Sequence, residues 1–146
     1  MVSLQFPTPE FEIERRGGKP YIFDSIRKAW LLLTPEEWVR QNMVAYLVKT
    51  LRYPKQLVAV EREILVNNLK KRFDILVYDS NHQPWMLIEC KEEKIQLSED
   101  VLQQLLRYHI AVPVSWLVIT TGVETLVWKK ENASLVLTES FPDWNA

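Results

Sequence analysis

Apolar extended segments that alternate with two capped helices constrain the fold of this chain more than any other feature of its sequence. Three such segments follow the first helix and three more follow the second, and their predicted bounds are 58–66, 72–78, 85–91, 114–121, 125–128 and 134–137. An order of helix, three strands, helix and further strands predicts an α/β fold with a mixed central sheet flanked by helices. No linker divides the segments, so we expect a single domain over residues 1–146.

Short signals mark the ends of these elements. Thr34 suits the N-cap of the first helix, Pro35 its first helical position, and Glu37 the return arm of a capping box. We expect that helix to run to about residue 51. Ser98 suits the N-cap of the second helix. The pair Gly17–Gly18 favours a tight turn between two short strands, which predicts a hairpin near the N-terminus. The last two predicted strands form a second hairpin at the C-terminus.

The scarcity of three residue types excludes several kinds of site. The chain has three glycines, too few and too dispersed for a dinucleotide fingerprint or a P-loop. One cysteine, Cys90, excludes a disulfide framework and a zinc site built from thiolates. His82 falls in a predicted turn and His109 on the apolar side of the second helix, so we expect neither to act as a ligand or base. Catalysis would therefore depend on carboxylates, lysines, amides and hydroxyls.

Charge and hydropathy limit the partners that we expect. A net charge of -1 argues against coating nucleic acid or acidic membranes through bulk charge. The sequence shows neither the pattern of a signal peptide nor an apolar run of the roughly 20 residues that a membrane span requires. We therefore expect a cytoplasmic protein without membrane contact.

Two carboxylates and a lysine carry the strongest chemical signal. Alternation along the predicted strand 85–91 places Glu89 and Lys91 on one face and Cys90 on the other. If Asp79 pairs with Pro84 across the intervening turn, Asp74 lies opposite Glu89, with Cβ atoms about 5 Å apart. A slip of one residue in that turn would separate the two carboxylates.

Adjacent carboxylates repel each other, and a divalent cation relieves the repulsion. Hard oxygen ligands suit Mg²⁺ or Mn²⁺, and a metal-bound water has a lowered pKa. Lys91 beside this pair would orient that water or stabilise charge on a phosphate, which is the equipment for phosphodiester hydrolysis. The alternative is a cross-strand salt bridge between Lys91 and one of the carboxylates on a solvated face. The flanking apolar runs favour strands that are covered on both faces, where isolated charges are costly.

The same residues resemble the PD-(D/E)xK nuclease superfamily, with Asp74 as the aspartate and Glu89 and Lys91 as the (D/E)xK. Within that superfamily the chain is similar to the type I restriction enzyme R-protein N-terminal family, over about residues 24–125 and in the family's order. The segments that carry this resemblance are 24–41, Tyr53–Pro54, 71–74, 87–91 and 103–108. The resemblance implies a restriction-endonuclease-like core and a metal-dependent DNA endonuclease, with Asp74 and Glu89 as the Mg²⁺ or Mn²⁺ ligands.

Further site residues are implied by the resemblance. The family's Gln-x-x-x-Tyr pattern corresponds to Gln104 and Tyr108, which stand at i, i+4 on one side of the second helix. A glutamate from the first helix completes the site. Periodicity does not choose between Glu36 and Glu37, and we favour Glu36. Each also has a structural explanation, since Glu37 suits a capping box and Glu36 can pair with Arg40.

Partners follow from a basic cluster and from what the chain lacks. The densest basic cluster consists of Lys70, Lys71 and Arg72, which could contact DNA phosphates. An equally good explanation is that these side chains are simply solvated at the start of a strand. Restriction subunits of this kind join the nuclease to an ATP-driven motor, for which this chain has no phosphate-binding loop. We therefore expect a targeting or motor subunit or a homodimer to bring it to DNA. The alternative is a catalytically silent nuclease fold that serves as a DNA-binding module or scaffold.

Overall fold

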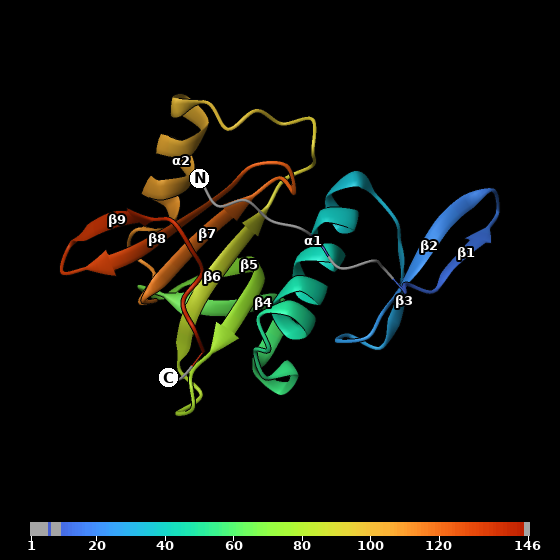
Figure 1. Ribbon diagram of the computed structural model, residues 1–146, viewed down its shortest axis with the longest axis horizontal. Coiled ribbons are helices and arrows are strands. Elements are labelled where there is room, and N and C mark those ends of the chain that lie inside the picture. Colours follow the sequence, from blue (N-terminus) through green and yellow to red (C-terminus); the bar gives the residue numbers. More distant parts are fainter. Residues whose placement is uncertain (1–5, 7–9, 145–146) are drawn as a thin grey trace.

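The computed structural model describes residue 6 and residues 10–144 and contains two sheets in this part of the chain. The smaller sheet is antiparallel and consists of β1 (Ile13–Arg16), β2 (Lys19–Asp24) and β3 (Ala29–Leu32). Its first two strands form the predicted N-terminal hairpin, with Gly17 and Gly18 at positive φ. The third strand was not predicted. This sheet extends from the body of the molecule at the side of the first helix (Figure 1).

The larger sheet has six strands in the order β4-β5-β6-β7-β8-β9, which is also their order in the sequence. Its pairings are antiparallel except for β6 with β7, which are parallel and connected through helix α2, so the prediction of a mixed sheet is confirmed. Its elements are β4 (Val58–Val66), β5 (Leu69–Tyr78), β6 (Pro84–Cys90), α2 (Glu99–His109), β7 (Trp116–Thr120), β8 (Thr125–Glu131) and β9 (Ser134–Thr138).

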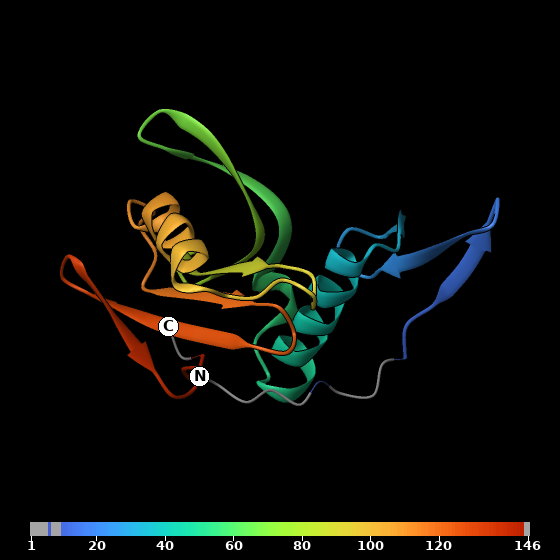
Figure 2. The same cartoon turned by 90° about the horizontal axis from the view of Figure 1, so that it is seen from above.

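The two helices cover opposite faces of this sheet, which confirms the α/β class (Figure 2). Helix α1 (Pro35–Ala45) and its continuation, the π-helix η1 (Tyr46–Thr50), pack through Val39, Met43 and Leu47 on alternate residues of β4, β5 and β6. A 3-10 turn η2 (Lys55–Leu57) leads into β4. Helix α2 packs on the other face through its partly buried leucines 102, 105 and 106. Both faces of β5 and β6 are therefore covered next to the charged residues that these strands carry.

The side-chain alternation of β4 reverses once along the strand, so that residues of the same parity pack against different helices before and after that position. In β4, Val58 and Val60 pack in the α1 cluster, whereas Val66, of the same parity, packs in the α2 cluster. The exchange occurs at Glu61, whose φ of +53° is left-handed and whose backbone interrupts the ladder. Left-handed φ is uncommon for a residue with a side chain. Beyond this position the β4–β5 ribbon curls away from the sheet on the side of α2 (Figure 2).

The helix N-termini form as predicted, with one difference. The Thr34 hydroxyl accepts a hydrogen bond from the Glu37 backbone N–H at 3.1 Å, and the Ser98 hydroxyl accepts one from Val101 at 3.4 Å. The capping-box role of Glu37 is wrong, because its carboxylate instead accepts hydrogen bonds from Arg27, Arg40 and Gln41. The two arginine cations attract the Glu37 carboxylate more strongly than a single backbone N–H does.

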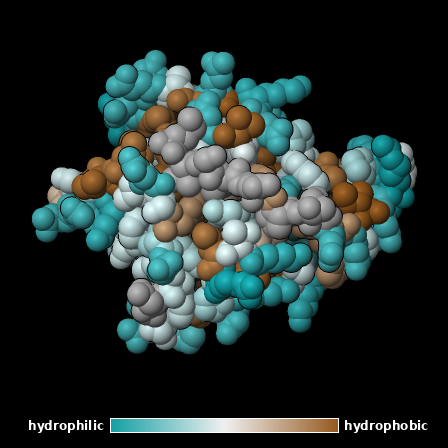
Figure 3. All heavy atoms as spheres, viewed as in Figure 1, coloured by the Kyte–Doolittle hydropathy of each residue, from teal (hydrophilic) through white to brown (hydrophobic). Residues whose placement is uncertain are grey.

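The surface is mixed, and hydrophobic residues gather in several places, among them the end of the large sheet (Figure 3). Figure 3 shows hydrophobic atoms over the β8–β9 hairpin, where Val136 and Leu137 are about half exposed.

Among the described residues, no helix has the length and apolar character needed to cross a membrane.

Candidate active site

The two predicted carboxylates meet at the point where β5 and β6 run side by side. Ile75 pairs with Ile88, and one further step along the same register brings Asp74 opposite Glu89. The turn that sets this register differs from the prediction. Tyr78, rather than Asp79, pairs with Pro84, and an irregularity between Val77 and Tyr78 restores the expected register for the rest of the hairpin.

Each oxygen of Asp74 has a partner. Oδ1 accepts a hydrogen bond from Nη2 of Arg40 at 2.8 Å, and Oδ2 accepts one from the backbone N–H of Cys90, also at 2.8 Å. The first bond ties β5 to helix α1, and the second ties it to β6. Since the side chain is only 12% exposed, these bonds fix the orientation of the Asp74 carboxylate.

Glu89 lies in a less polar environment than Asp74. Its side chain is 12% exposed and faces α2, where its Oε1 is 3.6 Å from Nε2 of His109. Burial, followed by the negative charge of Asp74, raises the pKa of Glu89 well above its usual range, and Lys91 opposes that shift. His109 is buried and burial lowers its pKa to about 4, so its ring is neutral at pH 7 and does not balance the carboxylates.

Arg40 supplies the buried positive charge on the α1 side of the site. Besides Asp74, its Nη2 lies 2.8 Å from Glu61 and 3.5 Å from Glu36, and its Nη1 donates to Glu37 at 2.6 Å. Burial alone would lower the pKa of Arg40, but the hydrogen bond and charge of Asp74 and the other carboxylates raise it. The guanidinium is therefore charged at every accessible pH.

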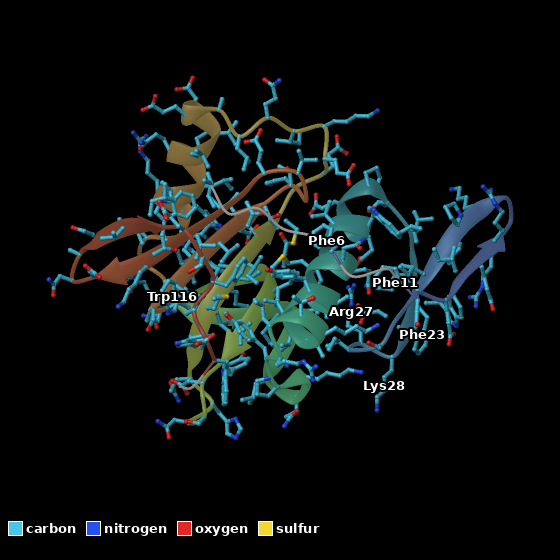
Figure 4. The ribbon with its side chains drawn as sticks, in the orientation of Figure 1. Phe6, Phe11, Phe23, Arg27, Lys28 and Trp116 are labelled. Carbon is cyan, nitrogen blue, oxygen red and sulfur yellow. The ribbon has the colours of Figure 1, made fainter. Side chains whose placement is uncertain are left out.

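The two helix glutamates, Glu36 and Glu37, occupy different environments, which periodicity could not distinguish. Glu37 is buried and belongs to an ion network with Arg27, Gln41 and Asp24 that joins α1 to the small sheet. Figure 4 shows Arg27 between that sheet and α1. Glu36 is 46% exposed at the side chain. Partial burial, and then the charge of Asp74, raises the pKa of Glu36, while Arg40 and Lys91 oppose the shift. Glu36 is thus the glutamate beside the strand carboxylates.

The other predicted residues lie further away. Gln104 is exposed on α2, and no hydrogen bond among the described residues joins it to Asp74 or Glu89. Tyr108 is 48% exposed and stacks edge-on against His109, with ring centroids 4.6 Å apart. Nζ of Lys71 lies 4.5 Å from the centre of the Tyr108 ring and donates to the Tyr108 carbonyl.

The remainder of the basic cluster lies on the curled ribbon. Lys70 and Arg72 are exposed on β5, and Arg72 is within 4.0 Å of both Glu61 and Glu63 on β4. The structure therefore places these basic residues on an element that projects from the sheet, with Arg72 two residues before Asp74 on β5 (Figure 2).

Comparison with known proteins identifies the family of this chain. The family model described as "Type I restriction enzyme R protein N terminus" matches residues 35–142, about three quarters of the chain. The chain belongs to this family. The match begins at helix α1, later than the resemblance over residues 24–125, and extends through the C-terminal hairpin. No curated protein matches the chain.

The side chains of this family member suit a hard divalent cation on chemical grounds. The described residues contain no group of three or more Asp, Glu, His or Cys spaced to hold a metal ion. Mg²⁺ nevertheless binds through one or two carboxylates and keeps several waters, so Asp74 and Glu89 suffice as protein ligands. Each Asp74 oxygen accepts a hydrogen bond from a described residue, and a carboxylate oxygen has a second lone pair with which it could bind a cation. Burial first, and then the negative charge of Asp74, raises the pKa of Glu89, and a cation between the two carboxylates would relieve that repulsion.

Three residues of the site, namely Arg40, Glu61 and His109, were not assigned to it by the sequence analysis. Arg40 stands four residues before Val44 and seven before Leu47, so it continues the buried face of α1, and a charge in such a position was a readable signal. His109 similarly continues the apolar stripe of α2, yet its contact with Glu89 depends on how the helix packs. Glu61 carried no signal, since its position depends on a local reversal of the strand.

Proposed function

We propose that this chain is a metal-dependent DNA endonuclease-like protein that hydrolyses phosphodiester bonds. The observation that carries the proposal is the convergence of Asp74 and Glu89 from adjacent strands, with Lys91 directly after the second. Membership of a restriction enzyme R-protein family supports DNA as the substrate.

Each residue has a distinct role in this proposal. Asp74 and Glu89 would hold Mg²⁺ or Mn²⁺, which when bound supplies an activated water and a Lewis acid for the phosphate. Lys91 is close enough to lower the pKa values of both Glu36 and Glu89, so it can orient the attacking water and stabilise charge on the phosphate. Glu36, partly exposed at the mouth of the site, can accept a proton or position a water. Gln104 and Tyr108 on α2 would contact the substrate from the other side.

The curled β4–β5 ribbon supplies a path for the DNA backbone. Arg62, Lys70 and Arg72 are exposed along it, and Arg72 stands two residues before Asp74 on β5. Phosphate contacts of this kind position a duplex without reading its sequence. Because the net charge of the chain is only -1, binding by this patch alone would be weak and sensitive to salt. Other restriction subunits would then bring the protein to its DNA.

Plasmid cleavage tests the proposal directly. Supercoiled DNA is incubated with the wild type, with Lys91→Ala and with Lys94→Ala, in Mg²⁺, in Mn²⁺ and in excess chelator. Lys94 is the matched control, because it is exposed on the loop three residues further along. We expect metal-dependent cleavage by the wild type and Lys94→Ala, and a loss of at least about 100-fold in Lys91→Ala. An inactive wild type, or equal cleavage by Lys91→Ala, would contradict the proposal.

A second candidate, a silent nuclease fold that binds DNA or serves as a scaffold, has one observation in its favour. Arg40 already neutralises Asp74 through a direct hydrogen bond, so the site can be electrostatically satisfied without a metal. Calorimetric titration with Mn²⁺ separates the two candidates. A scaffold that needs no metal shows no binding, whereas the proposed nuclease binds Mn²⁺ and loses that binding in Asp74→Asn.

A further inference from the structure

One guanidinium group serves four carboxylates at the candidate site. Nη1 of Arg40 is committed to Glu37, while Nη2 is shared among Asp74, Glu61 and Glu36 at 2.8, 2.8 and 3.5 Å. An Nη nitrogen has two hydrogens, so it cannot donate well to three acceptors at once. Its contact with Glu36 is the longest of the three. The three carboxylates therefore compete for the Nη2 atom, and a change in any one of them alters the strength of the hydrogen bonds that Nη2 donates to the other two.

The remaining nitrogen of this side chain has no partner among the residues that the structure describes. Nε of Arg40 is buried, in a side chain that is only 7% exposed, and makes no hydrogen bond within residue 6 and residues 10–144. A residue retained solely to stabilise the fold would ordinarily satisfy such a donor, because an unpaired buried N–H is costly. The arrangement directs the terminal nitrogens toward the carboxylates at the expense of Nε.

We propose that Arg40 is a positioning residue that sets the affinity of this site for divalent cations. Its guanidinium acts as a built-in counter-charge to Asp74 and Glu36 and competes with a cation for them. The inference rests on the proposed function, because Asp74 is the carboxylate that both cations would share. A unit positive charge only a few ångströms from a bound divalent ion weakens its binding, and removing that charge strengthens it.

Glu61 has the opposite effect in this scheme. It draws the same Nη2 atom away from Asp74, and its left-handed backbone in the middle of β4 turns its side chain toward Arg40. Non-glycine residues persist in that conformation only where the surrounding structure holds them there. Neutralising Glu61 leaves Arg40 more strongly attached to Asp74, so cation binding weakens. The two substitutions therefore have effects of opposite sign on one measured quantity.

Isothermal titration with Mn²⁺, in full-length protein whose folding is checked by circular dichroism, tests this inference. Arg40→Gln is expected to bind Mn²⁺ roughly tenfold more tightly than the wild type, whereas Arg40→Lys, which keeps the charge, binds like the wild type. Glu61→Gln is expected to bind roughly threefold more weakly. Glu63→Gln is the matched control, since Glu63 lies two residues along β4 with a half-exposed side chain and should leave the affinity unchanged.

The outcomes separate this inference from the proposed function. A folded Arg40→Gln that binds Mn²⁺ no more tightly than the wild type overturns the inference, even if the wild type cleaves DNA. If Arg40→Gln does not fold, an unchanged affinity in Glu61→Gln overturns it. If Arg40→Gln binds Mn²⁺ and the wild type does not, the inference is supported and the proposed nuclease activity of the wild type fails. If no folded variant binds Mn²⁺, both fail.

Discussion

Replacing Glu89 with glutamine should stabilise the metal-free protein at alkaline pH. Burial and the charge of Asp74 raise the pKa of Glu89, so the folded protein holds a proton that the unfolded chain releases above about pH 4.3. The stabilising contribution of the protonated carboxyl is therefore complete below that pH and declines as the pH rises toward the raised pKa. Glutamine has nearly the same shape and does not titrate, so Glu89→Gln escapes this loss.

The size of the effect follows from the proton that Glu89 keeps in the folded protein. Holding a proton that the unfolded carboxyl has lost costs about 1.4 kcal/mol for each pH unit above the unfolded pKa of about 4.3. Burial is the main cause of this cost, the charge of Asp74 adds to it, and Lys91 opposes it. We therefore expect Glu89→Gln to gain up to about 5 kcal/mol at pH 8, or roughly 15 °C in melting temperature for a domain of this size.

Calorimetric melting in excess chelator measures this difference at pH 8 and at pH 4.5. The gain should shrink toward zero at the lower pH, where the wild-type carboxyl is protonated in the folded state at little cost. Glu93→Gln serves as the control, because Glu93 is exposed on the loop that follows β6 and should change neither melting curve. A Glu89→Gln protein that is less stable than the wild type at pH 8 would refute the electrostatic reasoning.

Two further predictions concern buried charge elsewhere. Asp24 accepts hydrogen bonds from the backbone N–H groups of Ile26 and Arg27 and from the side chains of Arg27 and Gln41. Asp24→Asn should therefore lose about 3 kcal/mol of stability, measured by urea unfolding at pH 7. Burial opposes the shift, but Arg27 lowers the pKa of Asp24, so the stability that the Asp24 carboxylate contributes disappears as the pH falls through that lowered pKa. The stability difference between the wild type and Asp24→Asn should therefore be smaller at pH 2 than at pH 7, and an equal difference at the two pH values would disprove this account. Burial lowers the pKa of His109 to about 4, so the wild type should lose up to about 3 kcal/mol between pH 6.5 and 4 as the unfolded chain takes up a proton. His109→Leu should flatten that part of the stability profile measured by urea titration, and an unchanged slope would count against a neutral buried ring.

Sequence reasoning succeeded where a single strand or helix determined the outcome. Alternation along β6 placed Glu89 and Cys90 on opposite faces, and the caps at Thr34 and Ser98 located both helix starts. The approach of Asp74 to Glu89 was also predicted, although through a turn that forms differently. That register survived because the apolar residues of both faces fix it independently of the turn.

The interactions that reasoning missed depend on tertiary packing. Arg40 was considered only as a helical partner of Glu36, whereas it lies closer to Glu61 and Asp74 on the sheet, at 2.8 Å each, than to Glu36 at 3.5 Å. The reversal at Glu61 breaks the alternation that sequence analysis assumes to be uniform along a strand. Strand β3 contains only four residues and is held by pairing with β2, so its short apolar run gave little signal.

The single parallel pairing of the large sheet has a consequence for how the chain emerges during synthesis. Strands β4, β5 and β6 can pair through short hairpins as soon as they leave the ribosome, which assembles Asp74 and Glu89 early. Strand β6 must then wait for α2 and β7 before its second edge is covered. During that interval its apolar residues Trp85–Ile88 form an exposed, unpaired edge, the kind of segment from which aggregation begins. Heterologous expression should therefore be sensitive to chaperone supply and to growth temperature.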